Sequence, residues 1–473
     1  MRERCGEVCP LWLVEGIAIV PVAVSEDGFF GSKKECEMAQ GKLLAEGKTK
    51  KIFEIPDSPN VIVISKDDIT AGDGAKHDVF PNKRIFANRT NAAVFELLNA
   101  CDIPTAFVGS VIHDSYVAEW CEMLPYEVVI RRLALGSYCK RNPHVQPGTL
   151  FDTLVVEFFL KTTDKKFKGM DVPKDDPIIT AYGLDGALVY RADQPVGGLE
   201  GVARVPPDLL YGKDCNVGHP MKDKETSARK VFLVLESAWA GQRCTLSDLK
   251  IEFGYTKAGK LVVADVIDND SWRLFDPHGG HLDKQRYRDG GDLKVVATLY
   301  ENVAERVSAF ASLREKSRVI LWRASEKDDP RPFMEALRSY GSPVDLVLGL
   351  GSVHKKPEAC LKKLRAMLRD QRETVLIVFV GRSNGAGPVF AAETHVPVIT
   401  VPATVKEFPD DVWSSLRMPS DLPLMTVLDP ANAMLAAIGI LSQRSPHAYM
   451  ARRVVIENAR LDRSNSPTFG CDF

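Results

Sequence analysis

The feature that most constrains this chain is a change in hydrophobic rhythm near residue 318. Before that point, apolar runs come in pairs separated by turn residues, as in 43–55 and 61–69 around the turn DSPN, a pattern typical of antiparallel strands. After it, short continuous runs of Val, Ile and Leu alternate with helical patterns. Such runs are typical of parallel strands that helices cover on both faces. We therefore predict an α+β domain followed by an α/β domain with a parallel sheet.

The length of the chain agrees with this division, because 473 residues are too many for one ordinary hydrophobic core. We predict four segments: an N-terminal extension over 1–40, a first domain over 41–311, a short polar linker over 312–317 and a second domain over 318–473. Lys, Asp, Gly and Pro are dense over about 163–224. We expect this stretch to form a long loop or insertion on the surface of the first domain.

The charge balance and the cysteines restrict the partners and the compartment. Sixty-one Lys and Arg against 63 Asp and Glu leave a net charge of −2, which argues against a nucleic-acid or membrane-surface binder. The apolar run Leu11–Val24 is interrupted by Glu15 and Pro21 and is too short to span a bilayer. Ten cysteines without a C-x-x-C pair indicate reduced thiols. We expect a cytoplasmic protein with no nucleic-acid or membrane partner.

The segment SDLKIEFG carries the strongest chemical signal of the first domain. Because side chains alternate along a strand, Asp248, Lys250 and Glu252 share one face, and the apolar residues between them share the other. The next strand ends in ADVIDNDSWRL, which supplies Asp265, Asp268, Asp270 and Arg273. Carboxylates on adjacent strands suit Mg²⁺ bound with nucleotide phosphates. The alternative is a solvent-facing sheet with cross-strand ion pairs.

Three further segments of the first domain could bind phosphate or carboxylate groups. EGKTK offers Gly47, Lys48 and Lys50 at a turn, and TAGDGA adds a glycine-rich turn with Asp73; glycine and lysine at a turn suit polyphosphate. LPYEVVIRRLALGSYCKRN places arginines, including Arg131, near a Gly-Ser turn with Ser137, and arginines there can clamp an anion through two hydrogen bonds. The alternative is a set of solvated basic turns.

Taken in order over about residues 42–310, these segments and DKQRYRD resemble the SAICAR synthetase family. The resemblance implies an ATP-grasp-like fold and the ATP- and Mg²⁺-dependent joining of L-aspartate to carboxyaminoimidazole ribotide (CAIR). It implies ATP binding at Gly47, Lys48, Lys50, Lys250 and Glu252, with Lys250 also catalytic and Mg²⁺ held by Glu252 and Asp265. It implies substrate binding at Asp73, Arg131, Ser137, Asp248, Asp270 and Arg273. The sequence departs from the family pattern at Leu135 and in the length of about 185–214.

In the second domain, two polar segments follow predicted strands. GRSNGAGP (Gly381–Pro388) leads into a helix, so its backbone N–H groups suit an anion. GSVHKKPE places His354 directly after another strand, where open α/β sheets bind ligands. The alternative for His354 is a structural role.

SVHKKPE, GRSNGAGPV and DVWSSLRMPS resemble motifs of the animal AIR carboxylase family over about 318–445. The resemblance implies a flavodoxin-like fold, a homo-octamer and the addition of CO₂ to aminoimidazole ribotide (AIR) without biotin. It implies that His354 is catalytic, moving a proton at the carboxylated carbon, and that the substrate contacts Ser325, Asp328, Ser352, Arg382, Ser383, Asn384 and Gly385. The loop Ala324–Asp328 departs from the family pattern: Ala324 replaces a glycine and Lys327 a serine. Val353 and Val380 depart as well.

The leading hypothesis is a bifunctional enzyme of purine synthesis that makes CAIR from AIR and CO₂ and then ligates L-aspartate to it with ATP. A second hypothesis keeps only the synthetase active, with the second domain as an oligomerisation scaffold. A third is an unrelated ATP-dependent ligase or kinase that shares only the phosphate turns.

Overall fold

The computed structural model describes residues 40–71, 76–162, 166–173, 176–196, 202–214 and 220–465. The predicted extension lies outside these residues except for Gln40, and so does Asp73. No helix in the described part of the chain is both long and apolar enough to cross a membrane.

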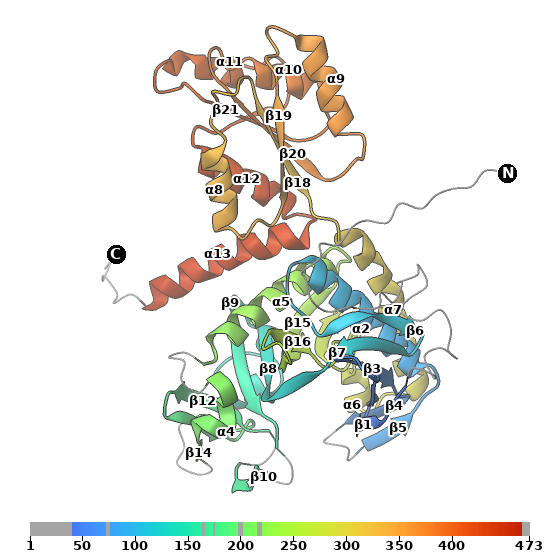
Figure 1. Cartoon of the computed structure of the whole chain (residues 1–473). Coiled ribbons are helices and arrows are strands. Elements are labelled where there is room, and N and C mark those ends of the chain that lie inside the picture. The colour runs from blue at the N-terminus through green and yellow to red at the C-terminus, as the bar shows by residue number, and fades with distance from the viewer. Residues whose placement is uncertain are drawn as a thin grey trace, which may run out of the picture.

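Two antiparallel sheets form the first half of the molecule, in the lower part of Figure 1. The smaller has the strand order β1 (Leu43–Glu46), β2 (Lys50–Glu54), β3 (Asn60–Ser65), β7 (Ser115–Glu119) and β6 (Phe107–Ile112). The larger runs β14 (Ala203–Val205), β13 (Gly186–Tyr190), β12 (Ile178–Gly183), β9 (Leu150–Leu160), β8 (Cys121–Leu133), β15 (Thr245–Thr256) and β16 (Leu261–Ala264), and β17 (Trp272–Phe275) also pairs with β15. Two-stranded pairs are β4 (Asp68–Ala71) with β5 (Lys76–Val79) and β10 (Lys166–Phe167) with β11 (Met170–Asp171).

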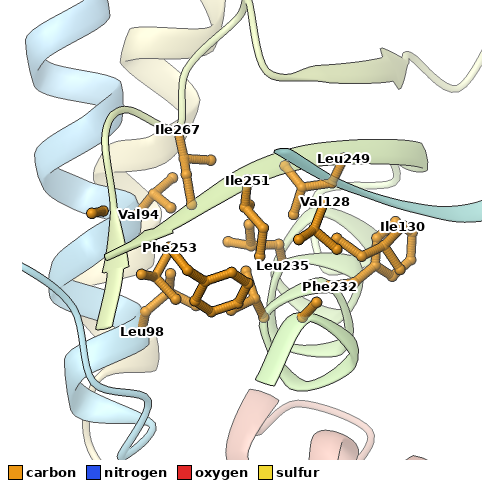
Figure 2. Packing of buried hydrophobic residues seen from close by; sticks show 14 of the residues in the cluster. Val94, Leu98, Val128, Ile130, Phe232, Leu235, Leu249, Ile251, Phe253 and Ile267 are labelled. Atoms are coloured by element: carbon orange, nitrogen blue, oxygen red, sulfur yellow. The ribbon is translucent and has the colours of Figure 1, made fainter. Parts of the chain in front are cut away.

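Helices bury one face of the larger sheet. The alternation predicted for β15 is confirmed, because Leu249, Ile251 and Phe253 lie in the core. They pack with Val128 and Ile130 of β8 against helices (Figure 2). The helices of this half are α2 (Lys83–Ala100), α3 (Ser137–Arg141), α4 (Pro207–Tyr211), α5 (Lys222–Ala240), α6 (Gln285–Arg288) and α7 (Leu293–Arg306), with the 3-10 helices η2 (Gly212–Asp214) and η3 (Val307–Leu313). The opposite face of β8 and β15 is left for charged side chains.

The stretch 163–224 differs from the expected loop. Strands β12 and β13 continue the larger sheet beyond β9, and β14 closes its edge. Their apolar residues are buried, as Val189 and Val205 show. The expectation of a loop is therefore wrong for these strands, because the dense turn-forming residues between them hid apolar runs of only three to six residues.

The second half contains one parallel five-stranded sheet, in the upper part of Figure 1. Its order is β19 (Asp345–Leu350), β18 (Arg318–Arg323), β20 (Thr374–Val380), β21 (Val398–Pro402) and β22 (Met425–Thr426). Its helices are α8 (Arg331–Ser339), α9 (Pro357–Met367), α10 (Ala386–Glu393), α11 (Trp413–Leu416) and α12 (Pro430–Leu441), with the 3-10 helix η4 (Pro409–Val412). Apolar clusters lie on both faces of this sheet. Both parts of the fold-class prediction are confirmed.

The last helix, α13 (Pro446–Asn465), does not stay with the half that precedes it. It leaves the parallel sheet and runs along α5 and β9 of the first half (Figure 1). Met450 and Val454 pack against the core of the first half. The last helix of the described chain therefore forms an interface with the middle of the first half.

Candidate active sites

A cavity of about 340 Å³ lies between the two sheets of the first half. We call it the inter-sheet cavity. Apolar side chains line most of it, including Ile52, Val61, Val63, Phe107 and Ala118. Five charged residues belong to the same lining: Lys50, Glu119, Lys161, Glu252 and Asp265. An apolar slot with charges in its wall suits a planar ring that carries anionic groups.

Four of the charged groups of the inter-sheet cavity form two ion pairs. Lys50 of β2 pairs with Asp265, which follows β16. Lys161 pairs with Glu252 of β15 at 2.6 Å. Burial lowers the pKa of Lys50 to about 8, and the negative charge of Glu252 opposes that shift only in part. Lys50 therefore changes its charge close to neutral pH.

The polar face of β15 continues from this cavity along the sheet, as the sequence predicted. Lys250 lies beside Glu127 of β8, with 2.9 Å between Nζ and Oε2. Burial raises the pKa of Glu127, and the ammonium group of Lys250 opposes this shift. Asp248 lies opposite Arg131 in the strand register. Four residues of strand from Glu252 to Asp248 cover about 13 Å, so one row of charges connects two binding regions.

At the far end of that row lies a group that we call the arginine cluster: Arg131, Ser137, Glu157, Asp248 and Arg273. Arg131 donates to Glu157 at 2.7 Å and to the Ser137 hydroxyl at 3.2 Å. Arg273 donates to Asp248 at 2.6 Å. Both guanidinium groups thus lie beside Asp248, Arg131 at 3.6 Å and Arg273 at 2.6 Å, and two guanidinium groups this close together suit a phosphate or carboxylate group.

Gly136 explains why this cluster needs a Gly-Ser turn. Its φ is +61°, a conformation that favours glycine. A Cβ at this position would lie 2.6 Å from a guanidinium nitrogen of Arg273. Any larger residue would displace Arg273 from Asp248.

Asp268 and Asp270 occupy a buried position beside the sheet. Asp270 pairs with Lys83 at 3.6 Å and with Lys284 at 3.2 Å, and it accepts from Tyr300. Burial and the neighbouring Asp270 raise the pKa of Asp268 to about 6. Although burial opposes it, the two lysines hold the pKa of Asp270 well below its ordinary value. The predicted substrate residue Asp270 thus has protein partners of its own.

The structure brings together most of the predicted residues of the first half. Gly47 and Lys48 lie in the turn between β1 and β2, where Lys48 is exposed and outside the lining of the inter-sheet cavity. Sequence reasoning missed Lys161, Glu127 and Glu157. Glu127 lies four residues before Arg131 within LPYEVVIRR, on the same face of the strand, so the alternation used for β15 could have identified it. Lys161 directly follows an apolar strand and has no motif of its own.

The acidic residues fit a cation that also binds phosphate. Among the described residues, no three His, Cys, Asp or Glu side chains gather so that they could hold a metal ion by themselves. Glu252 and Asp265 are two oxygen donors on one cavity wall, each already beside an ammonium group. Mg²⁺ commonly takes one or two carboxylates, and phosphate oxygens and water complete its shell.

In the second half, the site residues gather at the carboxyl ends of parallel strands. His354 follows β19, and Ser383 and Gly385 follow β20. The His354 Nε2 lies 3.4 Å from the Ser383 hydroxyl. A Cβ on Gly385 would lie 3.1 Å from the same nitrogen. The glycine loop, Gly381–Gly385, therefore leaves room for the imidazole.

The glycine loop is held in an uncommon backbone conformation. Ser383 and Asn384 have φ values of +68° and +46°. Asn384 is fully buried; its side chain donates to Ser415 at 2.8 Å and accepts from Thr400 at 2.6 Å. The Ser383 N–H donates to Asp411 at 2.9 Å. Thr400 and Asp411, which sequence reasoning missed, stabilise the loop. Backbone strain of this kind clusters at functional sites.

The remaining predicted residues of the second half have contacts of their own. Arg382 lies over the Phe408 ring, 3.9 Å from its centre. The Ser325 N–H donates to Asp328 at 2.9 Å, and the Lys327 N–H donates to the Ser325 hydroxyl at 3.2 Å. The loop Ala324–Asp328 is thus closed by its own side chains. Ser352 lies two residues after β19, and its backbone carbonyl accepts from the N–H groups of Lys355 and Lys356 in the following turn.

Comparisons with known proteins match both halves. A family model described as SAICAR synthetase matches residues 43–179 and 217–307, and one described as AIR carboxylase matches 319–459. The chain is 37% identical over 410 residues to the multifunctional protein ADE2 of Gallus gallus, covering 84% of this chain and 89% of that protein. The gap in the first match, 180–216, contains the edge strands β13 and β14.

Two further relatives match this chain over different lengths. The chain is 36% identical over 411 residues to the bifunctional phosphoribosylaminoimidazole carboxylase/phosphoribosylaminoimidazole succinocarboxamide synthetase of Homo sapiens, covering 84% of this chain and 89% of that protein. It is 40% identical over 285 residues to the phosphoribosylaminoimidazole-succinocarboxamide synthase of Roseiflexus sp., covering 58% of this chain and all of that protein.

Proposed function

This chain belongs to the family of bifunctional phosphoribosylaminoimidazole carboxylase/phosphoribosylaminoimidazole succinocarboxamide synthetases, and we propose that its two sites catalyse the two successive reactions of that family. The second half adds CO₂ to AIR and gives CAIR. The first half joins L-aspartate to CAIR with ATP and gives SAICAR. The chain would then act as both a lyase and a ligase of purine synthesis.

The observation that carries the synthetase assignment is the continuous charged face of β15. It connects the inter-sheet cavity at Glu252 with the arginine cluster at Asp248. ATP would lie in the cavity with its phosphates toward Lys50 and Lys161, and CAIR would bind at the arginine cluster. Lys250 lies between the two, where a phosphoryl group would pass.

The proposed ligation has two steps. A carboxylate oxygen of CAIR attacks the γ-phosphorus of ATP, ADP leaves, and an acyl phosphate forms. The amine of L-aspartate then attacks the acyl carbon, phosphate leaves with the C–O bond electrons, and the amine loses a proton. Lys50 and Lys250 would stabilise the charge on the transferred group. Mg²⁺ held by Glu252 and Asp265 would neutralise phosphate charge when it is bound.

In the carboxylase site, the imidazole carbon of AIR forms a bond to CO₂ and loses its proton. His354 would accept that proton, because its Nε2 faces the glycine loop at Ser383 and Gly385. Asn384 would act by holding the loop, since its own side chain is bound to Thr400 and Ser415. The proposed carboxylation uses no biotin.

We further propose a cytoplasmic homo-octamer assembled through the second half. Large apolar side chains that are exposed there support an assembly: Leu348, Trp413, Leu416, Met425 and Leu428. Light scattering of the purified chain tests this, and a monomer would contradict it.

A product assay tests both activities together. Purified protein receives ATP, Mg²⁺ and aspartate with either AIR and bicarbonate or CAIR. SAICAR from both mixtures is the expected result. SAICAR from CAIR alone would contradict the carboxylase assignment and favour the scaffold hypothesis, and no SAICAR from either would contradict the synthetase assignment.

A further inference from the structure

The ladder between β8 and β9 is irregular at Arg132. Arg131 pairs with Val155, but Leu133 pairs with Leu150. One residue of β8 therefore faces four residues of β9, 151–154, which we call the β9 bulge. Backbone groups in such a bulge lose their ladder partners and need others.

Side chains from three elements replace those partners. Arg132 itself donates to the Phe151 carbonyl at 3.1 Å. Arg229 of α5 donates to the Leu154 carbonyl at 2.7 Å. The Leu154 N–H donates to Glu457 at 3.1 Å. Glu457 belongs to α13, so the helix that follows the second half binds backbone inside the sheet of the first half.

Glu457 also fixes the side chain of Arg132. The guanidinium group donates to Glu457 at 2.8 Å and to both carboxylate oxygens of Glu236 on α5, at 2.7 and 3.1 Å. Arg453 donates to Glu457 at 2.8 Å as well. The Glu457 side chain is only 2% exposed. A buried carboxylate with this many donors holds its neighbours in one arrangement.

Arg131 and Arg132 are adjacent on β8 and point to opposite faces of the sheet. Arg131 reaches the arginine cluster, and Arg132 reaches α5 and α13. We propose that Glu457 is a positioning residue of the synthetase site: by fixing Arg132 and the β9 bulge, it sets the β8 backbone that aims Arg131 at CAIR. This inference rests on the proposed synthetase function.

The position of Arg131 in the site predicts which kinetic constant changes. Arg131 belongs to the arginine cluster, about 13 Å along the strand from the inter-sheet cavity. Loss of the Glu457 charge should therefore weaken CAIR binding and leave ATP binding intact. A merely structural role would instead reduce the amount of active protein, which lowers kcat and leaves both KM values unchanged.

The test uses the full chain with Glu457→Gln. We expect KM for CAIR to rise about tenfold, which is typical of coupling between separate groups, with KM for ATP and the carboxylation rate unchanged. Because the two substitutions act in part through the same guanidinium group, Glu457→Gln/Arg132→Met should raise KM for CAIR by less than the product of the two single increases. An unchanged KM for CAIR, or equal increases for CAIR and ATP, would overturn the proposal.

Arg460→Gln is the matched control. Arg460 lies on the same helix and donates to the Asp152 carbonyl at 2.9 Å, but its side chain is 46% exposed. Because solvent-exposed contacts contribute little, the Arg460→Gln variant should have the same KM for CAIR as the wild type. An increase as large as that of Glu457→Gln would overturn the assignment to Glu457.

Amide hydrogen exchange separates this inference from the proposed function, since it needs no turnover. Glu457→Gln should speed exchange in a peptide that covers 150–156, because Leu154 donates to Glu457, and Arg460→Gln should not. Unchanged exchange would overturn the proposal even if the wild type forms SAICAR. Failure of the proposed function would instead appear as a wild type that forms no SAICAR from CAIR.

Discussion

The two candidate sites solve the problem of binding an anionic substrate in opposite ways. The synthetase site uses side-chain charges that are already paired inside a sheet, such as Lys50 with Asp265 and Arg131 with Glu157. The carboxylase site uses a backbone loop in an uncommon conformation, with the His354 Nε2 lying 3.4 Å from the Ser383 hydroxyl. Charge should therefore dominate the response of the first site to mutation and pH, and loop shape should dominate that of the second.

The largest effect should come from His354→Ala. Removing a general acid–base should lower the carboxylation rate about 10³-fold, while SAICAR formation from CAIR stays unchanged. Rates measured separately from AIR and from CAIR check this. His395→Ala, at an exposed histidine of the same half, should leave both rates as they are. A residual carboxylation rate within threefold of the wild type would remove His354 from the chemistry.

Lys50→Met should give the next largest effect, on the other site. Loss of a preorganised positive charge at the transferred phosphoryl group should lower SAICAR formation about 10²-fold and spare carboxylation. Lys51→Met is the matched control, because Lys51 neighbours Lys50 on β2 but forms only an exposed pair with Glu46 at 3.7 Å. Equal losses in the two variants would show that the charge of the strand, rather than Lys50, matters.

The pH dependence of ATP binding should sharpen the contrast. Lys50 is protonated below its pKa of about 8 and neutral above it. Above that pH, Lys50 of the free protein must therefore take up a proton before it can form an ion pair with a phosphate of ATP. Affinity for ATP should fall by up to about tenfold per pH unit above 8. Titration calorimetry from pH 6.5 to about 9.5 measures this dependence. Lys50→Arg stays charged throughout, so an equally steep decline in that variant would exclude Lys50 as its cause.

The smallest effect should come from Gly385→Ala in the glycine loop. The new Cβ would lie 3.1 Å from His354 Nε2, so the imidazole must shift by a few tenths of an ångström, and carboxylation should fall about fivefold. Gly381→Ala meets nothing closer than 3.8 Å and should leave the rate unchanged. If both alanine variants reduce carboxylation equally, the loss in Gly385→Ala is not caused by reduced space beside His354.

Alternation along single strands made much of the first site predictable. Asp248, Lys250 and Glu252 had to share a face, and the sheet gives that face to charged partners. The partners themselves, such as Lys161 and Glu157, come from β9 and its end, where no spacing in the sequence connects them to β15. Cross-strand contacts depend on register, and bulges such as that at Arg132 shift the register without a local signal.

The return of α13 to the first half could not be predicted for a similar reason. Its apolar residues Met450 and Val454 fit any helix that covers a sheet, and nothing in their spacing says which sheet. Glu457 carries a charge, yet its side chain is buried by partners that lie some 300 residues earlier in the chain. Burial of a carboxylate depends on donors that only the folded chain brings together.

The route of α13 has a consequence for the order in which the protein is made. The first half is synthesised and can begin to fold long before residues 446–465 leave the ribosome. Until then, the Leu154 N–H and Arg132 lack the carboxylate that binds them in the finished molecule. With the proposed role of Glu457, a growing or truncated chain would hold Arg132 and the β9 bulge without one of their partners, and the ligase half would reach its final geometry only after the lyase half has been made.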